Sequence, residues 1–305
     1  MRYFVLRRLA EMAGALLVMS LIVFLLARAL GDPVSLLLSE FATEADRAAL
    51  TRELGLDRSL AVQYVTFLLD TLRGDLGNSV MGARQPVLGI IIDRLPASLG
   101  LASVALALSV LFGLPLGVAA AVWRGTWVDT GVRLVALIGQ AVPLFWLGIV
   151  LMFVFGVQLG WLPTSGFGSA RHFVLPAATM ALFTLAAVAR LTRVSMLEEL
   201  DSEYVRLARI KGLPETTVIL KHALSNSLVP VLTYMGAFFA TMITGAVVIE
   251  TVFGWPGIGR LAYEAILARD FPLMQGVVLV TTTLFMVANM LVDVTHAWID
   301  PRVRR

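Results

Sequence analysis

Residues 203–230 read EYVRLARIKGLPETTVILKHALSNSLVP, a polar-rich run flanked by long apolar segments. Basic and apolar residues alternate through residues 203–211, and this pattern predicts a short amphipathic helix. Gly212 suits the C-terminal end of that helix, and Pro214 favours the first turn of a second helix over residues 215–224. The stretch therefore predicts two short helices joined by a tight turn.

The residues after this helix pair lead back into an apolar segment. Ser225 or Asn226 can cap the next helix, which runs into lipid. Two short helices between two membrane spans can push on, or be pushed by, a body outside the membrane. We therefore expect the pair to have a mechanical role.

The composition is that of an integral membrane protein. Of the 305 residues, 58% are hydrophobic and 15% are charged, and the mean hydropathy is +0.86. A soluble globular domain carries roughly 25% charged residues. The chain has no Cys, which excludes disulfides, iron–sulfur clusters and Cys-ligated zinc.

Six apolar segments reach or approach the roughly 20 residues needed to cross about 30 Å of hydrocarbon. The first is followed by Ala27-Arg28-Ala29, which mimics a signal-peptide cleavage site, but no soluble domain follows it, so we expect a retained span. The predicted fold class is an all-α polytopic membrane protein with six transmembrane helices. The segments cover residues 12–27, 99–122, 134–159, 173–191, 228–249 and 275–298.

The distribution of Lys and Arg predicts the orientation. Six spans place both termini on one side, and with that side inside, the inner segments hold 14 of the 24 Lys and Arg residues. Seven of the other ten lie between Arg28 and Arg94, in the long segment after the first span. The positive-inside rule therefore predicts cytoplasmic termini and places residues 203–230 in the cytoplasm.

Residues 31–96 form the one long hydrophilic region. We expect a helix from Thr43 to Gly55, a second over residues 59–73, and a third that opens at Pro86. Positive and negative charges nearly balance there, so nothing indicates nucleic acid. The region is either an ordinary extramembrane cap or a docking surface for a protein that delivers a solute.

Few polar side chains fall inside the predicted spans, and they are Gln140, Asn289 and Asp293. A carboxylate is costly in hydrocarbon, so Asp293 is a candidate functional residue. It also lies in the last third of its span, where pairing with Arg190 or Arg193 near the inner surface is an equal alternative.

Residues 250–272, ETVFGWPGIGRLAYEAILARDFP, follow a span directly. Their start combines glycines and a proline with aromatic groups, and non-helical backbone at membrane depth is tolerated only against protein or a watery cavity. The loop is either a gate on the outer side or a passive interfacial segment. The candidate gate residues are Glu250, Phe253, Trp255, Pro256, Gly257 and Gly259.

Catalytic and metal-binding signatures are absent from the sequence. It contains no G-x-x-x-x-G-K-[ST] phosphate loop, no H-E-x-x-H and no G-x-S-x-G. His172, His222 and His296 fall on different segments and predict no metal site. We expect neither an enzyme nor a cofactor on this chain.

Short motifs along the whole chain show a family resemblance. They are Gly31-Asp32-Pro33, Leu54-Gly55-Leu56-Asp57, Gly74-Asp75-Leu76-Gly77, Leu162-Pro163, Tyr204-Val205-Arg206 with Ala208, Lys211 and Gly212, His222-Ala223, Pro230, Glu250, Pro256-Gly257-Ile258-Gly259, Arg269-Asp270 and Asp300-Pro301-Arg302. In this order they resemble the permease subunit of bacterial ABC importers of the dipeptide/oligopeptide/nickel group, in the subtype with a long periplasmic loop after the first span.

The resemblance implies a type I ABC importer permease fold in two parts. Residues 1–97 would form an N-terminal transmembrane anchor with an extracytoplasmic helical segment, and residues 98–305 the permease core. Residues 203–222 would be the cytoplasmic coupling segment, which docks into an ATPase subunit. The coupling residues would be Glu203, Tyr204, Arg206, Ala208, Arg209, Lys211, Gly212 and Pro214.

The coupling segment departs from the general importer consensus, E-A-A-x-x-x-G. Ala208 and Gly212 match it, but Arg206 stands at the Glu position and Leu207 at the first Ala. No single Glu contact can therefore be carried over. Arg206 and Arg209 could instead pair with acidic groups on the partner.

The resemblance also implies an assembly. It would comprise a second homologous permease chain, two ATPase subunits that bind ATP-Mg, and an extracytoplasmic solute-binding protein, in the lipid of the bacterial inner membrane. Peptides are the expected solute, and nickel, glutathione or another small solute are alternatives. From another class, a stand-alone secondary transporter or channel remains a rival.

Overall fold

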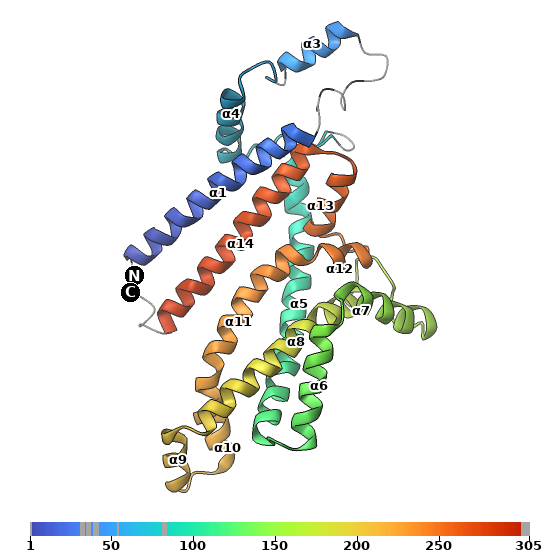
Figure 1. Cartoon of the computed structure of the whole chain (residues 1–305). Helices are drawn as coiled ribbons and strands as arrows, with labels where there is room; N and C mark the ends of the chain where they lie inside the picture. The colour runs from blue at the N-terminus through green and yellow to red at the C-terminus, as the bar shows by residue number, and fades with distance from the viewer. Residues whose placement is uncertain are drawn as a thin grey trace.

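The computed structural model describes residues 2–30, 34, 38, 43–53, 55–80 and 84–299, and nearly all of its secondary structure is helical (Figure 1). Leu54 and the motif residues 31–33 and 300–302 lie outside the described residues. The elements are, in chain order, α1 (Arg2–Leu30), α3 (Glu44–Glu53), α4 (Leu60–Leu72), α5 (Val87–Val122), α6 (Trp127–Ala141), α7 (Leu144–Leu151), the π-helical η1 (Met152–Gln158), α8 (Ala170–Leu200), α9 (Glu203–Ile210), α10 (Glu215–Thr217), the π-helical η2 (Val218–Ala223), α11 (Leu224–Gly245), α12 (Val247–Val252), α13 (Ile258–Leu267) and α14 (Phe271–Ile299).

Five helices of the described chain are long and apolar enough to cross a membrane, and a bent helix pair makes a sixth span if its two halves cross together. The all-helical polytopic fold is thus confirmed. The segment 134–159 is not one straight span, because Trp127–Ala141 and Leu144–Gln158 meet at 103°. Val142 is extended (ψ 126°) before Pro143, and a residue before proline is disfavoured in the helical region.

Two elements that we expected to be separate form one helix. The helix predicted to open at Pro86 and the span predicted over residues 99–122 are both part of the 36-residue α5. Pro96 does not end the helix, since Ile91 and Leu101 on either side of it are both fully buried in hydrophobic clusters. The expected division between residues 97 and 98 therefore falls inside a helix.

The helix after the turn at Pro214 also continues further than predicted. Residues 215–243 form one continuous apolar helix with a π-helical segment at Val218–Ala223, so Ser225 and Asn226 lie inside it and do not cap a new helix. The helix α8 covers Ala170–Leu200 and is longer than the predicted span over residues 173–191.

The centre of the molecule is the packing of α5 against α8 (Figure 1). A Cβ built at Gly117 would lie 2.5 Å from Thr192 Cβ and 2.6 Å from the Ala189 carbonyl oxygen, so only glycine allows this approach. Small residues at helix crossings are typical of membrane proteins, where close backbone contact stabilises the pair.

The segment between α1 and α5 lies at the end of the molecule where α14 begins (Figure 1). The predicted helices over residues 43–55 and 59–73 are present as α3 and α4. The buried Asp270 joins this segment to the core, because its carboxylate accepts hydrogen bonds from Ser79 Oγ (2.5 Å) and the Val80 N–H (2.8 Å).

Candidate coupling surface and outer loop

The short helix α9 rests on the ends of two spans. Val205 and Ala208 are buried in one cluster with Ala121 of α5, Met196 of α8 and Val218 of η2. Val205 and Ala208 are three positions apart and therefore lie on the same side of α9. This side fixes the helix to the bundle. This is the amphipathic helix that the sequence predicted.

The other side of α9 is exposed and carries large apolar residues beside Arg206 and Arg209. Leu207 is 54% exposed, Ile210 is 79% exposed, and Leu213 continues the patch beyond the helix. Figure 1 places α9 and α10 at the end of the molecule opposite α3. Exposed apolar residues gathered on one short helix are typical of a surface that binds a protein.

The turn after α9 is a Schellman motif. Gly212 has φ +77°, its N–H donates to the Arg209 carbonyl (2.9 Å), and the Leu213 N–H donates to the Ala208 carbonyl (3.3 Å). This left-handed backbone favours glycine. Pro214 then sets the direction of α10, as the sequence predicted.

The arginines expected to reach a partner pair within the chain in this structure. Arg206 lies 3.1 Å from Glu203, and Arg209 lies 2.8 Å from Glu215. The hydrogen bond with Glu215 raises the pKa of Arg209. Exposed pairs of this kind contribute at most about 1 kcal/mol, so a partner can displace them.

Tyr204 connects α9 to two neighbouring helices. Its hydroxyl contacts the Glu199 carboxylate at the end of α8, accepts a hydrogen bond from the Asn226 amide of α11 (2.8 Å), and lies 3.3 Å from the His222 carbonyl. Sequence reasoning missed Glu199 and gave Asn226 a capping role. Tyr204 follows Glu199 by five positions, and this nearness in the sequence was the one available sign of their contact.

Residues 250–259, named the outer loop from here on, contain a buried carboxylate that caps a helix. Glu250 accepts hydrogen bonds from Ser98 Oγ (2.5 Å) and from the Arg260 N–H (2.9 Å), and Ser98 in turn accepts the Ile258 N–H (2.8 Å). These N–H groups begin α13, where an anion is favoured by the unpaired donors and the helix dipole. A Cβ at Gly257 would collide with the Glu250 carboxylate.

Trp255 anchors the same loop in the protein. The side chain is fully buried, Nε1 donates to the Ala97 carbonyl (2.9 Å), and the ring meets Phe167 and Phe173 edge-on at 4.9 and 4.5 Å. Phe253 is also buried, against Gly148 of α7. Gly259 packs with its Cα side against the Val247 backbone, where a Cβ would lie 2.7 Å from Val247 Cα. The loop is therefore packed core.

The three polar residues predicted inside spans do not form one site. Asp293 pairs with Arg8 of α1 at 3.0 Å, so the expected pairing with Arg190 or Arg193 is wrong. Asn289 donates to the Phe285 carbonyl of its own helix, and Gln140 lies apart from both, on α6.

Arg193 has a different partner, which the sequence reasoning missed. It contacts the buried Asp129 of α6 through Nε (2.6 Å) and Nη2 (2.9 Å). Asp129 also lies 3.4 Å from Arg133. The i, i+4 spacing of Asp129 and Arg133 was a local signal for their own contact, and nothing in the sequence indicated Arg193. The bidentate pair of Arg193 and Asp129 fixes α6 to α8.

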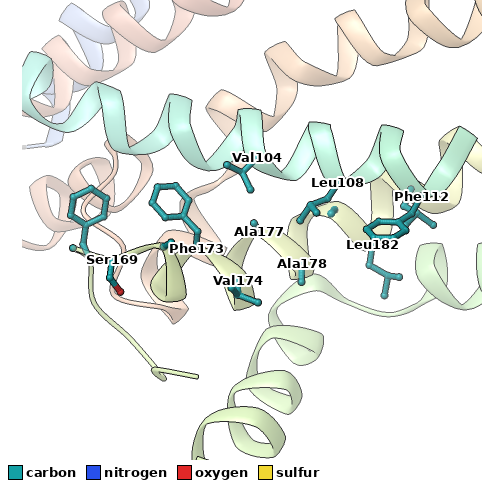
Figure 2. Close-up of a pocket in the computed structure, with 14 residues that line it drawn as sticks. Val104, Leu108, Phe112, Ser169, Phe173, Val174, Ala177, Ala178 and Leu182 are labelled. Atoms are coloured by element: carbon teal, nitrogen blue, oxygen red, sulfur yellow. The ribbon is translucent and has the colours of Figure 1, made fainter. Parts of the chain in front are cut away.

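A cavity of about 880 Å³ lies along α5 and α8. Figure 2 shows Val104, Leu108 and Phe112 of α5 facing α8 residues such as Phe173 and Ala177. Its lining is almost entirely apolar, which suits a hydrocarbon or helix surface and no ionic chemistry. Within the described residues there is no group of three His, Cys, Asp or Glu side chains that could hold a metal.

Comparison with known proteins assigns the family. The binding-protein-dependent transport system inner membrane component family matches residues 113–305, and the N-terminal component of such membrane proteins matches residues 1–102. The chain therefore belongs to this family of ABC importer permeases, which are multi-pass membrane proteins and are not themselves catalytic.

Two similar proteins cover almost the full length of the chain. A "Putative peptide transport system permease protein" of Brucella abortus is 42% identical, over 98% of both chains. A glutathione transport system permease protein of Salmonella typhimurium is 40% identical, over 99% of this chain and 98% of that one.

Solved structures show the same fold at low identity. A chain of the MetNI methionine ABC transporter in an inward-facing form has a TM-score of 0.59 at 16% identity, covering 70% of this chain and 97% of that one. An amino acid ABC transporter has a TM-score of 0.56, also at 16% identity, covering 68% and 93%.

Proposed function

We propose that this chain forms half of the translocation pathway of a peptide importer and receives force from an ATPase subunit at the α9–α10 surface. The observation that carries the proposal is the exposed apolar patch of Leu207, Ile210 and Leu213 on a helix whose other face is fixed to α5, α8 and η2. A partner that binds this patch is mechanically connected to the spans.

The route of the force runs through continuous helix. Beyond Pro214, residues 215–243 form one helix, and Tyr204 ties α9 to it through Asn226. A movement of α9 therefore reaches α11 by two routes, the turn at Gly212–Pro214 and the contact between Tyr204 and Asn226. The π-helical segment Val218–Ala223 lies within this connection, and such segments are frequent at functional sites.

The outer loop is the proposed gate of the pathway. It follows α11 directly, at the other end of the same helix, so movement at the coupling surface is transmitted toward Glu250, Phe253 and Trp255. Rocking of the spans about the packed α5–α8 pair would then alternate access between the two sides.

The proposed assembly follows from family membership and from the surfaces of this chain. A second, homologous permease chain forms the other half of the pathway, two ATPase subunits bind ATP-Mg, and an extracytoplasmic binding protein delivers the solute. The Lys and Arg distribution supports cytoplasmic termini and a cytoplasmic α9 in the bacterial inner membrane. Residues 1–97 and 98–305 remain the proposed anchor and core.

The proposed substrate is a short peptide. The relatives' names mention peptides and glutathione, which is itself a tripeptide, and they support this chemical class. Reconstitution of the complete complex with its binding protein tests the proposal by measuring uptake of labelled dipeptides, oligopeptides and glutathione. We expect ATP-dependent uptake of at least one peptide. Uptake that persists without the ATPase subunits would favour a stand-alone transporter instead.

A further inference from the structure

Helix α4 is strongly apolar, yet no part of it is fully buried. Its 13 residues, LAVQYVTFLLDTL, contain one charge, Asp70, and none of them is buried. Five large apolar side chains are 45–76% exposed, and they are Leu60, Val62, Val65, Leu69 and Leu72. An apolar helix left uncovered in water is unfavourable, so a surface of matching chemistry must cover it.

The contacts of α4 place it beside a membrane span. The Tyr64 hydroxyl lies 2.9 Å from Ser20 Oγ and 3.3 Å from the Leu17 carbonyl of α1, and the Tyr64 ring meets Phe24 edge-on at 5.5 Å. The apolar span of α1 covers Val5–Ala29, so Leu17 lies at its middle. Helix α4 therefore contacts the second half of the span, from its midpoint onward.

The surface of α1 around these contacts is also apolar and exposed. Six large residues between the middle and the end of the span are 41–59% exposed, and they are Leu17, Val18, Leu21, Ile22, Leu25 and Leu26. A transmembrane helix presents such residues to acyl chains. The contacts of Tyr64 and Phe67 hold α4 beside this part of α1, so we expect the two helices to share one environment.

The charged residues near α4 gather at its two ends. Asp57 and Arg58 precede the helix and Arg73 and Asp75 follow it, all four are exposed, and Arg73 also lies 4.0 Å from Asp70, the one charge on the helix. Arginines at the ends of an apolar helix extend toward lipid phosphates while the stems stay in the apolar layer.

We infer that α4 is embedded in one leaflet of the membrane, beside the second half of α1, with lipid acyl chains covering its exposed apolar side. Helix α4 is thus a membrane-embedded part of the segment between α1 and α5, and this part is not an extramembrane cap. With the proposed orientation, this is the outer leaflet. Membrane contact itself does not depend on that orientation.

Single-cysteine labelling of the full complex in nanodiscs tests the inference, because this chain contains no native Cys and any Cys of the partner subunits is replaced by Ser. Val65→Cys and Leu69→Cys on α4 carry a fluorophore. Val18→Cys on α1 is the lipid-exposed control, and Ala49→Cys, an exposed residue of α3, is the water-exposed control. The samples lack the binding protein, and the probes are quenched with nitroxide-labelled lipid or with aqueous iodide.

We expect the α4 probes to match Val18→Cys within about twofold in lipid quenching and to resist iodide. Iodide quenching equal to that of Ala49→Cys would overturn the inference, since α4 would then lie in water. Protection from both quenchers would also overturn it, because protein would cover the helix. Peptide uptake by the same variants is measured separately, so a failure of the proposed transport function leaves this readout intact.

Discussion

The Tyr204 hydroxyl accepts a 2.8 Å hydrogen bond from the Asn226 amide, which joins the coupling surface to the helix that leads toward the outer loop. The two residues are 22 positions apart, on α9 and α11. If force passes from α9 to α11, this contact lies on its path.

Asn226→Leu should lower peptide uptake about fivefold, since it removes its hydrogen bond with Tyr204, which is worth about 1 kcal/mol. Tyr204→Phe should lower uptake at least as much, because it also removes the contacts with Glu199 and the His222 carbonyl. The double variant should lose little more than Tyr204→Phe alone, because that change already removes the shared contact. Uptake into proteoliposomes at equal protein is the measurement. Tyr263→Phe is the matched control, since no partner is described for its hydroxyl. Additive losses in the double variant would show that the two residues act independently.

Gly212→Val should uncouple ATP hydrolysis from transport. At φ +77° a side chain costs about 1–2 kcal/mol, and valine would reshape the turn that orients α9 against α10. Binding-protein-stimulated ATP hydrolysis and uptake are measured side by side.

Gly160→Val is the control for Gly212→Val, because Gly160 has φ +63° in the turn after η1 and a Cβ there meets no described atom within 4 Å. It should keep the ratio of uptake to hydrolysis. Equal loss in both variants, or normal coupling in Gly212→Val, would refute a specific role for the Gly212 turn.

Gly257→Ala should destabilise the outer loop by about 1–3 kcal/mol, because the added methyl group collides with the buried Glu250 carboxylate. Thermal unfolding of the detergent-solubilised complex measures the change. Gly131→Ala, where a Cβ meets no described atom within 4 Å, should leave the midpoint unchanged or slightly raised. An unchanged midpoint for Gly257→Ala would mean that the loop is not packed as described.

The outer loop should change accessibility during transport if it is the gate. Pro256 is partly exposed in this structure, so a cysteine in its place (Pro256→Cys) can be labelled with a maleimide. We expect its labelling rate to change at least severalfold when the ATPases are trapped with nucleotide. Tyr263→Cys on the neighbouring α13 reports on general changes. Identical rates at Pro256→Cys in both states would exclude a gating movement of the loop.

The local features of the coupling surface were predictable from the sequence. The turn at Gly212 and Pro214 is encoded by residues within a few positions of one another, so backbone chemistry alone predicts it. The break before Pro143 had a signal of the same kind, because the residue before a proline is disfavoured in a helix. We nevertheless expected one span over residues 134–159, across this break.

The long-range contacts could not be read from one sequence. Asp293 pairs with Arg8, and Glu250 with Ser98, across 285 and 152 positions. Such pairs depend on which helices lie side by side. Tertiary packing also overrode a local rule at Pro96, where buried neighbours on both sides keep α5 continuous.

The central claim is that this chain receives force from an ATPase at the exposed face of α9, and Ile210→Asp tests it most directly. A charge at a side chain that is 79% exposed should leave the fold intact but disrupt an apolar interface. We expect Ile210→Asp to lose the copurifying ATPase and to lower ATP-driven peptide uptake at least tenfold. Ile210→Ala is the milder change and should lower both by less. Wild-type ATPase binding and uptake in Ile210→Asp would contradict the claim.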